Sequence, residues 1–368
     1  MKKVIFIAAI AISSLSYGQD LSYSYYNYVM NRFNLNPAFA GNNGNISAML
    51  NTKTHMAGFN NSPRNTMFGM HAPINLSQGV GARVVSDRRG AYQVDKYDAV
   101  YSYQIQLDDR SDLRFGVSAG AVNRKLNPTS IDNSEFLNQN DPTLVGGYFD
   151  ETNFIAGVGL VYDFENLQIG LSAPNLIDGS DEISDFIVGS VSYNYKLSNE
   201  DFVLKPTVIY QNLPVVDNQF DILLKGEYQE KVWAMAGYRS NNNLTFGLGF
   251  DLGPFGVGYA YEMTNSELST IAGGSHEILI QVAFKSAKLK RKDELVKTLD
   301  EYVARFDAMI NDNSNQYNRG QVVSEIQQIR VELSKLEASN DKSTAKIVDK
   351  RLQTIEEQIE QLENKYGK

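Results

Sequence analysis

The feature that most limits the fold is an alternation of apolar and polar residues from about Asn45 to Phe284. In the stretch YDAVYSYQIQL, Tyr101, Tyr103 and Ile105 fall on one face, and serine and glutamine alternate with them. A period of two residues is typical of β-strands, because successive side chains of a strand point to opposite faces. NFIAGVGLVYDF and PFGVGYAYE repeat the pattern with glycine on the second face. The region therefore predicts an all-β domain.

A soluble sandwich and a membrane barrel share this alternation, but other features of the chain favour the barrel. The chain begins MKKVIFIAAIAISSLSYG, and two lysines before a short apolar run are typical of a secretory signal peptide, here removed before Gln19. The 21 tyrosines and 18 phenylalanines suit the aromatic girdles of outer-membrane barrels. We therefore expect a transmembrane β-barrel of about 14 antiparallel strands, with the apolar face toward lipid.

The connections between the expected strands indicate which end faces the periplasm. Strands are expected to start near residues 45, 65, 79, 97, 111, 152, 167, 185, 202, 219, 232, 243, 254 and 275. Connections after even-numbered strands are short, and the longest, Asn127 to Glu151, follows the fifth strand. Because outer-membrane barrels have short periplasmic turns and longer outer loops, both termini are expected in the periplasm. The short turn near Asn241 is an exception, since it falls on the outer side.

Beyond Phe284 the apolar residues recur every three and four positions, which is a helical pattern. The expected apolar seam comprises Leu295, Leu299, Tyr302, Phe306, Ile326, Ile329, Leu333, Leu336, Leu352, Ile355, Ile359 and Leu362. Polar stretches at 311–320 and 338–343 divide it into segments too short to be stable as isolated helices. We expect a periplasmic α-helical extension, either a three-helix module or a coiled coil formed with a partner. Lys288 to Lys292 is either a solvated segment or a contact with anionic lipid head groups.

The chain is therefore expected to divide into four parts. These are a signal peptide at 1–18, an N-terminal plug or periplasmic segment at 19–44, an outer-membrane β-barrel at 45–284 and a helical periplasmic extension at 285–368.

Several functional classes are disfavoured by the residues present. The formal net charge of −9 argues against a nucleic-acid partner, and the absence of cysteine excludes disulfides and thiol chemistry. His276 and Glu277 are adjacent on a strand, so they face opposite ways and cannot chelate one ion together. The same geometry separates Ser275 from His276, so we expect no catalytic site, cofactor or metal. The acidic stretch Asn127 to Glu151 lacks the spacing of a calcium loop and is interpreted as a surface loop or a cargo contact.

Four groups of residues resemble one family in the family's own order. They are Asn36, Pro37, Ala38, Ala40 and Gly41, with Phe39 in place of a tyrosine; Gly58, Phe59, Pro63 and Thr66; Trp233, Gly237, Tyr238, Arg239 and Ser240; and Tyr259, Tyr261, Ser275, His276 and Glu277. The chain thereby resembles the PorP/SprF family of outer-membrane proteins from type IX secretion and gliding machinery. The resemblance spans nearly the whole barrel and does not extend to the helical tail.

The resemblance implies a non-enzymatic barrel that supports secretion and surface anchoring of type IX cargo, such as a large gliding adhesin, by binding the cargo's C-terminal domain. An alternative from the same family is a docking point for the periplasmic ring of the secretion system. A further alternative, from the barrel pattern alone, is a diffusion channel for small solutes. The expected partners are outer-membrane lipid, secreted cargo and periplasmic components that contact residues 285–368.

The stretch NPAFAG before the first strand is the main candidate for a special role. Pro37 holds Asn36 in an extended or turn conformation, and the small residues that follow permit close backbone approach. We interpret it as a plug inside the barrel or across its periplasmic mouth, with a cargo or partner contact as the alternative.

Charged residues on the expected strands are predicted to face the lumen, because charge on the lipid face is costly. Arg239 and Glu262 are expected to form one internal network with Asp163, Glu227 and Glu277, which either packs the lumen or lines a selective pore. His276 is expected to form a hydrogen bond with a neighbouring strand.

Overall fold

The computed structural model describes residues 31–366 except 43, 59–60, 76, 109, 127–149, 180–185, 198–200, 213–217, 241, 264–272, 286, 312–318 and 339–344. The side chains of residues 287–296, 319, 330, 332–350 and 366 also lie outside the described part. The predicted signal peptide and the start of the predicted plug are not among the described residues. The chain forms two compact units, a β unit that ends at Phe284 and a helical unit that begins at Lys285.

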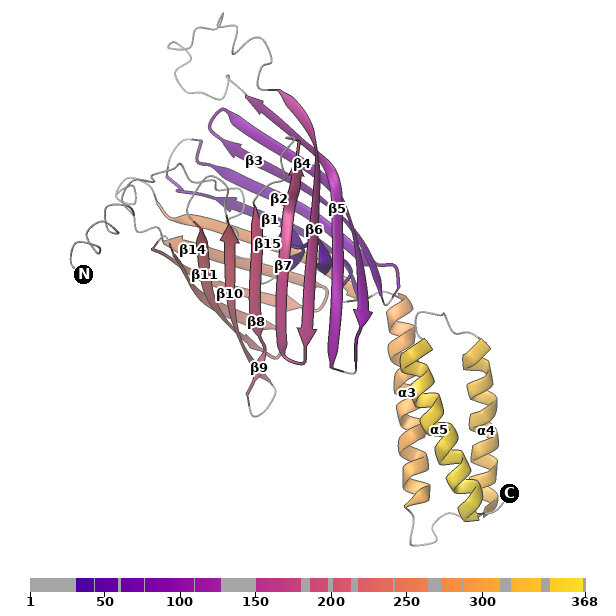
Figure 1. The fold of residues 1–368 in the computed structure, drawn as a ribbon. Coiled ribbons are helices and arrows are strands. Elements are labelled where there is room, and N and C mark those ends of the chain that lie inside the picture. Colours follow the sequence, from indigo (N-terminus) through magenta and orange to yellow (C-terminus); the bar gives the residue numbers. More distant parts are fainter. Residues whose placement is uncertain are drawn as a thin grey trace, which may run out of the picture. The chain divides into compact units, whose positions relative to one another are not determined.

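The first unit is a closed antiparallel β-barrel (Figure 1). Its strands are β1 (Asn45–Thr54), β2 (Arg64–Pro73), β3 (Gln78–Arg89), β4 (Tyr92–Gln106), β5 (Ser111–Leu126), β6 (Glu151–Phe164), β7 (Leu167–Asp178), β8 (Ile187–Tyr193), β9 (Tyr195–Lys196), β10 (Phe202–Asn212), β11 (Gln219–Tyr228), β12 (Val232–Arg239), β13 (Asn243–Leu252), β14 (Phe255–Met263) and β15 (Ser275–Lys285). Each strand pairs with the next along the chain, except that β8 and β9 both pair with β10, and β15 lies beside β1, which closes the barrel.

The barrel has 14 strand positions, as the sequence predicts. The sheet contains 15 assigned strands, but β8 and β9 both pair with β10 and are one strand interrupted at Asn194. Most strands begin within a few residues of their expected starts. β4 is the largest exception, since it begins at Tyr92 rather than near residue 97. Only Gly90 and Ala91 separate it from β3, and the positive φ of Gly90 (59°) permits such a tight turn.

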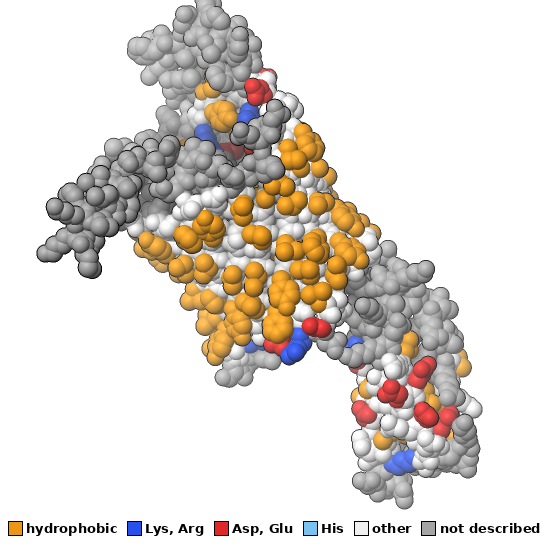
Figure 2. Space-filling view, viewed as in Figure 1, with side chains coloured by type: hydrophobic (Ala, Val, Ile, Leu, Met, Phe, Trp, Pro, Cys, Tyr) orange, Lys and Arg blue, Asp and Glu red, His pale blue; other side chains and the backbone are white. Residues whose placement is uncertain are grey.

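The outer surface of the barrel is apolar, as the alternation predicts. Tyr101, Phe115, Phe154 and Val257 are 41–56% exposed on the outer face. Figure 2 shows hydrophobic side chains spread across the described part of this wall. An apolar band of this kind is the surface that a barrel presents to lipid.

The inner face is not uniformly polar, which corrects the expectation from the alternation. Inward-facing residues of β1 to β7 include many serines, glycines and charged groups. Along β8 to β14 a cluster of buried apolar side chains fills the interior instead. It contains Phe186, Val188, Ile209, Leu223, Trp233, Met235 and Ala260. In VWAMAGYR both faces of the strand are apolar, so its alternation does not reveal the inner face.

The two ends of the barrel differ in their connections. We call the end where β1 begins and β15 ends the terminal end, and the opposite end the loop end. The connections at the terminal end are all short, such as residues 165–166 and 253–254. The longest connection, residues 127–150, lies at the loop end. Two short turns also lie there: residues 240–242, which are the expected exception to the length rule, and residues 90–91, which are a further exception that the sequence did not predict.

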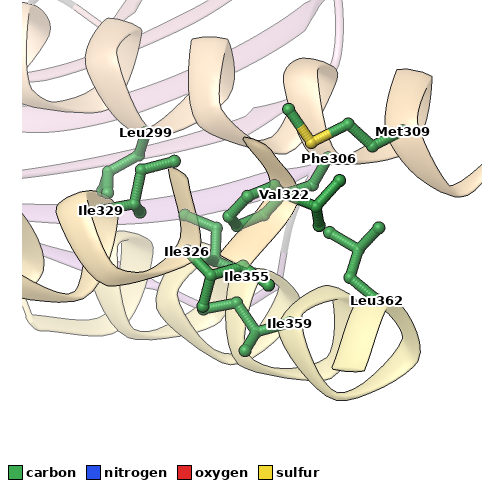
Figure 3. Close-up of a cluster of buried hydrophobic side chains, with 9 residues drawn as sticks. All are labelled: Leu299, Phe306, Met309, Val322, Ile326, Ile329, Ile355, Ile359 and Leu362. Carbon is green, nitrogen blue, oxygen red and sulfur yellow. The ribbon is translucent and has the colours of Figure 1, made fainter. Parts of the chain in front are cut away.

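The second unit consists of three helices, α3 (Ala287–Ile310), α4 (Arg319–Ala338) and α5 (Ala345–Tyr366). They share one apolar core, shown in Figure 3. The core contains Leu299, Phe306, Met309, Val322, Ile326, Ile329, Ile355, Ile359 and Leu362. In the described part of the chain, none of the helices is long and apolar enough to cross a membrane.

Most of the expected helical seam lies in this core. Tyr302 and Leu352 are partly buried against it. The side chains of Leu295, Leu333 and Leu336 lie outside the described residues. The helices therefore pack on one another, which is the first of the two arrangements that the sequence allows.

Candidate functional site

A short segment before β1, residues 31–42, is enclosed by the barrel, and we call it the inner segment. It contains two 3-10 turns, η2 (Arg32–Asn34) and η3 (Pro37–Phe39). Its partners are inward-facing residues of β2 to β8, and the side chain of Ala38 is fully buried. The whole NPAFAG stretch lies within it, so the candidate site is the contact between this segment and the inner wall.

Asn36 and Pro37 shape the segment and attach it to the wall. Pro37 is the first residue of η3, and the Asn36 carboxamide oxygen accepts a hydrogen bond from the backbone N–H of Ala38 at 2.9 Å. The Asn36 amide nitrogen donates to the backbone carbonyls of Leu160 (3.1 Å) and Leu171 (3.3 Å). These two residues are partners in the ladder between β6 and β7. One side chain thus caps the turn and binds two strands.

Inward-facing glycines give the segment the room that it needs. A Cβ atom on Gly116 would lie 2.1 Å from the backbone nitrogen of Ala38, and one on Gly159 would lie 2.0 Å from the Asn36 side-chain oxygen. A Cβ on Gly79 would lie 2.2 Å from the carbonyl oxygen of Ala40. Because no side chain fits these spaces, the segment rests directly on the backbone of β3, β5 and β6.

Arg83 on β3 holds the first turn of the segment. Its Nη1 donates to the carbonyl oxygens of Phe33 (3.0 Å) and Asn34 (2.9 Å). Its Nε and Nη2 bind the carboxylate of Asp98 on β4, with a shortest distance of 2.5 Å. The guanidinium carbon also lies 5.3 Å from the centre of the Phe33 ring. A buried arginine with all these partners fixes the segment in position.

Further polar contacts hold the rest of the segment. Ser102 Oγ donates to the carbonyl oxygen of Ala40 at 2.7 Å, and Ser172 Oγ donates to that of Leu35 at 2.9 Å. The backbone N–H of Gly41 donates to His71 Nδ1 at 3.1 Å. Gly41 has φ of +64°, which an L side chain rarely adopts. This backbone conformation explains why the NPAFAG stretch ends in glycine.

Phe39 lies between two arginines. The guanidinium carbons of Arg32 and Arg114 are 5.8 Å and 5.6 Å from its ring centre. Arg114 also forms an ion pair with Asp163. Aromatic faces attract cations at such distances, so Phe39 joins the segment to β5 and β6.

The inner segment and the apolar lumen residues together fill the middle of the barrel. Leu35 packs into the cluster of Trp233 and Leu223, while Phe33 and Phe39 belong to a second cluster with Val100 and others. These side chains are 1–6% exposed, so water does not reach them.

A cavity of about 150 Å³ lies between the inner segment and the loop end. Its walls include Asn34, Arg83, Lys96, Asp98, Arg124 and Asp178. The cations there have local partners, since Arg124 pairs with Asp178 and Lys96 donates to the Asn175 side-chain oxygen at 2.6 Å. The cavity is therefore a polar chamber with charges of both signs.

A second buried cluster lies where β1 meets β11 to β15. Lys53 binds Glu262 at 2.7 Å, and Arg239 binds Asp221 through two nitrogens at 2.7 and 2.9 Å. Asn243 donates to the other Glu262 oxygen at 2.5 Å, and Arg239 lies 3.8 Å from it. Lys53 and Arg239 are only 1% exposed. Because water does not solvate them, each cation needs its carboxylate partner to offset the cost of burying its charge.

The single network expected from the sequence is wrong in its membership. Arg239 and Glu262 face the lumen together, as expected, but Asp163 pairs with Arg114 and Glu227 pairs with Lys225 at 2.7 Å. Asp163 pairs with a cation on the adjacent strand and Glu227 with one on its own strand, whereas Glu262 binds Lys53 two strands away.

His276 and Glu277 lie on opposite faces of β15, as strand geometry requires. Glu277 is 1% exposed and accepts a hydrogen bond from Asn51 Nδ2 at 2.9 Å. His276 Nδ1 is hydrogen-bonded to the hydroxyl of Tyr259 on β14 at 2.7 Å. The Tyr261 ring lies 5.2 Å from the His276 ring. His276 therefore belongs to an aromatic group on the outer wall.

The remaining family-motif residues have separate surroundings. Trp233 is buried in the apolar lumen cluster, whereas Tyr238 faces outward and donates to the Asn242 side chain at 3.0 Å. The carbonyl of Pro63 accepts from the His55 N–H at 2.8 Å. Gly58 lies at the loop end with φ of +135°, and Phe59 is outside the described residues.

Within the described residues, no three histidine or acidic side chains are close enough together to hold a metal ion. The acidic stretch 127–149 lies outside the described part.

Sequence reasoning missed several residues that hold the inner segment. Arg83 and Ser102 are ordinary polar positions of strands, and their partner is a distant segment of the chain. The inward glycines gave a usable signal, since Gly157 and Gly159 alternate with apolar residues in NFIAGVGLVYDF. Glycine repeated on one face of a strand indicates close backbone approach.

Comparison with known families, curated sequences and solved structures gives three results. The model of the family described as type IX secretion system membrane protein PorP/SprF matches residues 15–282. The match covers the inner segment and nearly all of the barrel, and it ends before the helices. Among curated protein sequences, none matches the chain.

Several solved outer-membrane proteins are similar to the barrel. Acinetobacter baumannii Omp33 has 6% identity and a TM-score of 0.40, with 65% of this chain and 99% of that chain covered. The CymD monoaromatic hydrocarbon channel has 10% identity and a TM-score of 0.44, covering 70% and 92%. The Ralstonia pickettii toluene transporter TbuX has 12% identity and a TM-score of 0.40, covering 67% and 91%.

Proposed function

Because the chain belongs to the PorP/SprF family of type IX secretion system membrane proteins, we propose that it anchors a secreted protein at the cell surface. The family and the barrel fold make it an outer-membrane protein of type IX secretion. This family and this fold are those of structural or transport barrels rather than of a known enzyme class. The proposal adds that the barrel binds the C-terminal domain of a secreted cargo, such as a large adhesin, and does not pass solutes.

The observation that carries the proposal is the filled lumen. The inner segment is bound to β2 through β8, and apolar side chains of β8 to β14 fill the space beside it. A diffusion channel needs a continuous path for water, and buried side chains in mid-lumen oppose one. A sealed barrel offers its two ends to protein partners.

The orientation that we propose has both termini in the periplasm. It is supported by the connection lengths, since every connection at the terminal end is short and the longest connection lies at the loop end. The loop end then faces the cell exterior and is the proposed seat of the cargo. The polar chamber behind the loop end adds charged groups that a cargo segment can contact.

The helical unit is proposed to act in the periplasm. It has its own apolar core, and α5 exposes Glu356, Glu357 and Glu360. A folded module of this kind can contact a periplasmic component of the secretion system while the barrel stays in the membrane. Removal of Lys288 to Lys368 is expected to leave the barrel inserted, which heat-modifiable mobility on gels would report.

The first test is an affinity purification of the tagged full-length chain from native membranes, followed by mass spectrometry. Co-purification of a large surface protein with a type IX C-terminal domain is the expected result. Recovery of the periplasmic ring of the secretion system without cargo would favour a docking role for the chain over cargo anchoring.

Conductance in planar bilayers tests the sealed lumen separately. The full-length protein is expected to give no stable pores. Wide, long-lived pores together with recovery of the barrel alone would establish the diffusion channel instead.

A further inference from the structure

The outer wall at the loop end of β1 to β5 carries a continuous row of polar side chains. In the strand register Thr54 is opposite Arg64, Arg64 is opposite Arg88, Arg88 is opposite Gln93, and Gln93 is opposite Lys125. Because alternate residues of a strand share a face, the row lies on the same side of the wall as the outward apolar residues. It places Arg64 and Arg88 next to each other on the outside of the barrel, with Lys125 on the far side of Gln93.

The two arginines of this row lie opposite each other, and their like charges repel. Arg64 and Arg88 are both exposed, and among the described residues neither has an acidic partner. Like charges directly opposite on neighbouring strands are destabilising, so their pairing favours an anion between them. Lys125 differs, because its Nζ lies 3.1 Å from the carboxylate of Asp95.

A hollow at the rim adjoins the arginines. It has a volume of about 500 Å³ and lies between the β1–β2 connection and the β3–β4 turn. Arg64, Arg88, Thr54, Asn61, Ser62 and Gln93 supply its polar lining, with small residues between them. No aspartate or glutamate is among its described lining residues. Guanidinium groups with hydroxyl and amide donors are suited to bind phosphate oxygens.

The row lies at the level where a membrane's head groups are expected. One row nearer the middle of the barrel, the outward residues include the hydroxyl groups of Thr52, Thr66 and Ser86. The next row contains Leu50, Phe68, Val84 and Tyr97, which are 40–52% exposed. Successive outward rows are about 7 Å apart along a strand. The arginines therefore lie just beyond the last apolar row.

The cations are confined to one sector of the wall. On the opposite side, the outward residues near the loop end are Ile222, Tyr238, Leu244 and Met263, which are paired in register. These residues are 43–57% exposed and carry no charge. A general interfacial girdle would surround the barrel, so the arginine pair is a local site.

We infer that Arg64 and Arg88 bind the phosphate groups of a phosphorylated glycolipid in the leaflet at the loop end. In the proposed orientation this leaflet is the outer one, whose lipid A carries phosphates on its sugars. The hollow receives the sugar, the two guanidinium groups bind phosphate oxygens, and the apolar rows below contact the acyl chains. Cargo binding is not required for this contact.

The test uses the full-length protein in detergent and measures lipid binding by native mass spectrometry. The probes are bis-phosphorylated lipid A, enzymatically dephosphorylated lipid A, phosphatidylglycerol and inorganic phosphate. The variants are Arg64→Gln with Arg88→Gln together, Arg88→Gln alone, and the double lysine replacement. Arg110→Gln is the matched control, since Arg110 is 68% exposed and its strand connection lies at the terminal end. Heat-modifiable mobility checks that each barrel is folded.

Lipid A is expected to bind the wild type and Arg110→Gln equally. Each lost arginine should weaken binding roughly tenfold, which corresponds to ~1.4 kcal/mol. The lysine variant should retain part of the affinity, and dephosphorylated lipid A should bind weakly to every form. Equal binding by the glutamine variants would overturn the inference, and so would equal binding of phosphatidylglycerol. Efficient competition by inorganic phosphate would assign the site to a free anion. If the glutamine variants lose fold as well as binding, the arginines have a structural role in the barrel itself, and this outcome would also overturn the inference.

Discussion

The middle of the barrel lumen and the core of the helical unit are both filled by buried groups, but the groups differ in kind. In the helical unit the buried groups are apolar side chains such as Leu299, Phe306 and Ile355. In the half of the barrel that holds the inner segment, they are charged pairs, hydroxyls and bare backbone. The reason is the surroundings, because a membrane barrel presents its apolar face to lipid and a helical bundle in water turns it inward.

This difference teaches what each region tolerates. A core of apolar side chains loses stability in proportion to the volume removed. A lumen of matched pairs and close backbone contacts is sensitive to any added atom or unpaired charge. The predictions below test that contrast, from the largest expected effect to the smallest.

The strongest test adds one methyl group to the lumen. Gly116→Ala places a Cβ atom 2.1 Å from the backbone nitrogen of Ala38, so the inner segment must move. We expect residues 31–42 to become sensitive to added protease and the barrel to conduct in planar bilayers. Gly189→Ala is the matched control, since a Cβ there meets no atom within 4 Å. Equal behaviour of the two variants would show that the segment is not tightly held.

The second test replaces a buried charge with an apolar side chain of similar length. Arg239→Met leaves Asp221 without its bidentate partner, which should destabilise the barrel by ~3–5 kcal/mol. The measurement is the denaturant midpoint of the barrel in lipid vesicles. Arg110→Met removes an exposed ion pair and is expected to shift the midpoint little. A neutral Arg239→Met would mean that this lumen accepts apolar packing as readily as the helices do.

The third test removes apolar volume from the helical core. Phe306→Ala in the full chain should cost ~3–5 kcal/mol and unfold the helices, while the barrel stays folded. Far-ultraviolet circular dichroism reports the helices, and gel mobility reports the barrel. Val331→Ala, at a side chain that is 54% exposed, is the control with little expected change. Loss of barrel mobility in Phe306→Ala would contradict the division into two units.

The smallest effect is expected at a surface ion pair of the helical unit. Arg305 binds Glu325 at 3.1 Å, but its side chain is 61% exposed. Arg305→Ala should therefore change helical stability by less than ~1 kcal/mol. Thermal unfolding at low and high salt measures it, and a larger loss would show that charge pairs matter outside the lumen as well.

The strand positions could be predicted because the residues within each strand alternate between its outward and inward faces. The outward residues of NFIAGVGLVYDF and PFGVGYAYE followed from alternation alone, and so did the change of period after Phe284. β4 was placed late because Gln93 and Asp95 occupy its first outward positions and interrupt the apolar pattern.

The partners across the lumen could not be predicted in the same way. The pairing of Lys53 with Glu262, or of Arg83 with the carbonyl of Phe33, depends on where the closed barrel places distant strands. A single strand's sequence does not contain that information. The apolar half of the lumen was missed for a related reason, because VWAMAGYR is apolar on both faces.

The enclosure of the inner segment also constrains how the protein is made. Asn36 emerges early from the translocation machinery, yet its side chain binds the carbonyl of Leu160, which is 124 residues later. The carbonyl of Leu35 accepts a hydrogen bond from Ser172, which is 137 residues later in the chain. Once β1 and β15 have paired, the hydrogen-bonded wall leaves no gap between strands through which residues 31–42 could enter the barrel from the side. The inner segment can therefore complete its contacts only after β6 and β7 have been made, so the residues just before the barrel depend on strands that follow much later in the chain.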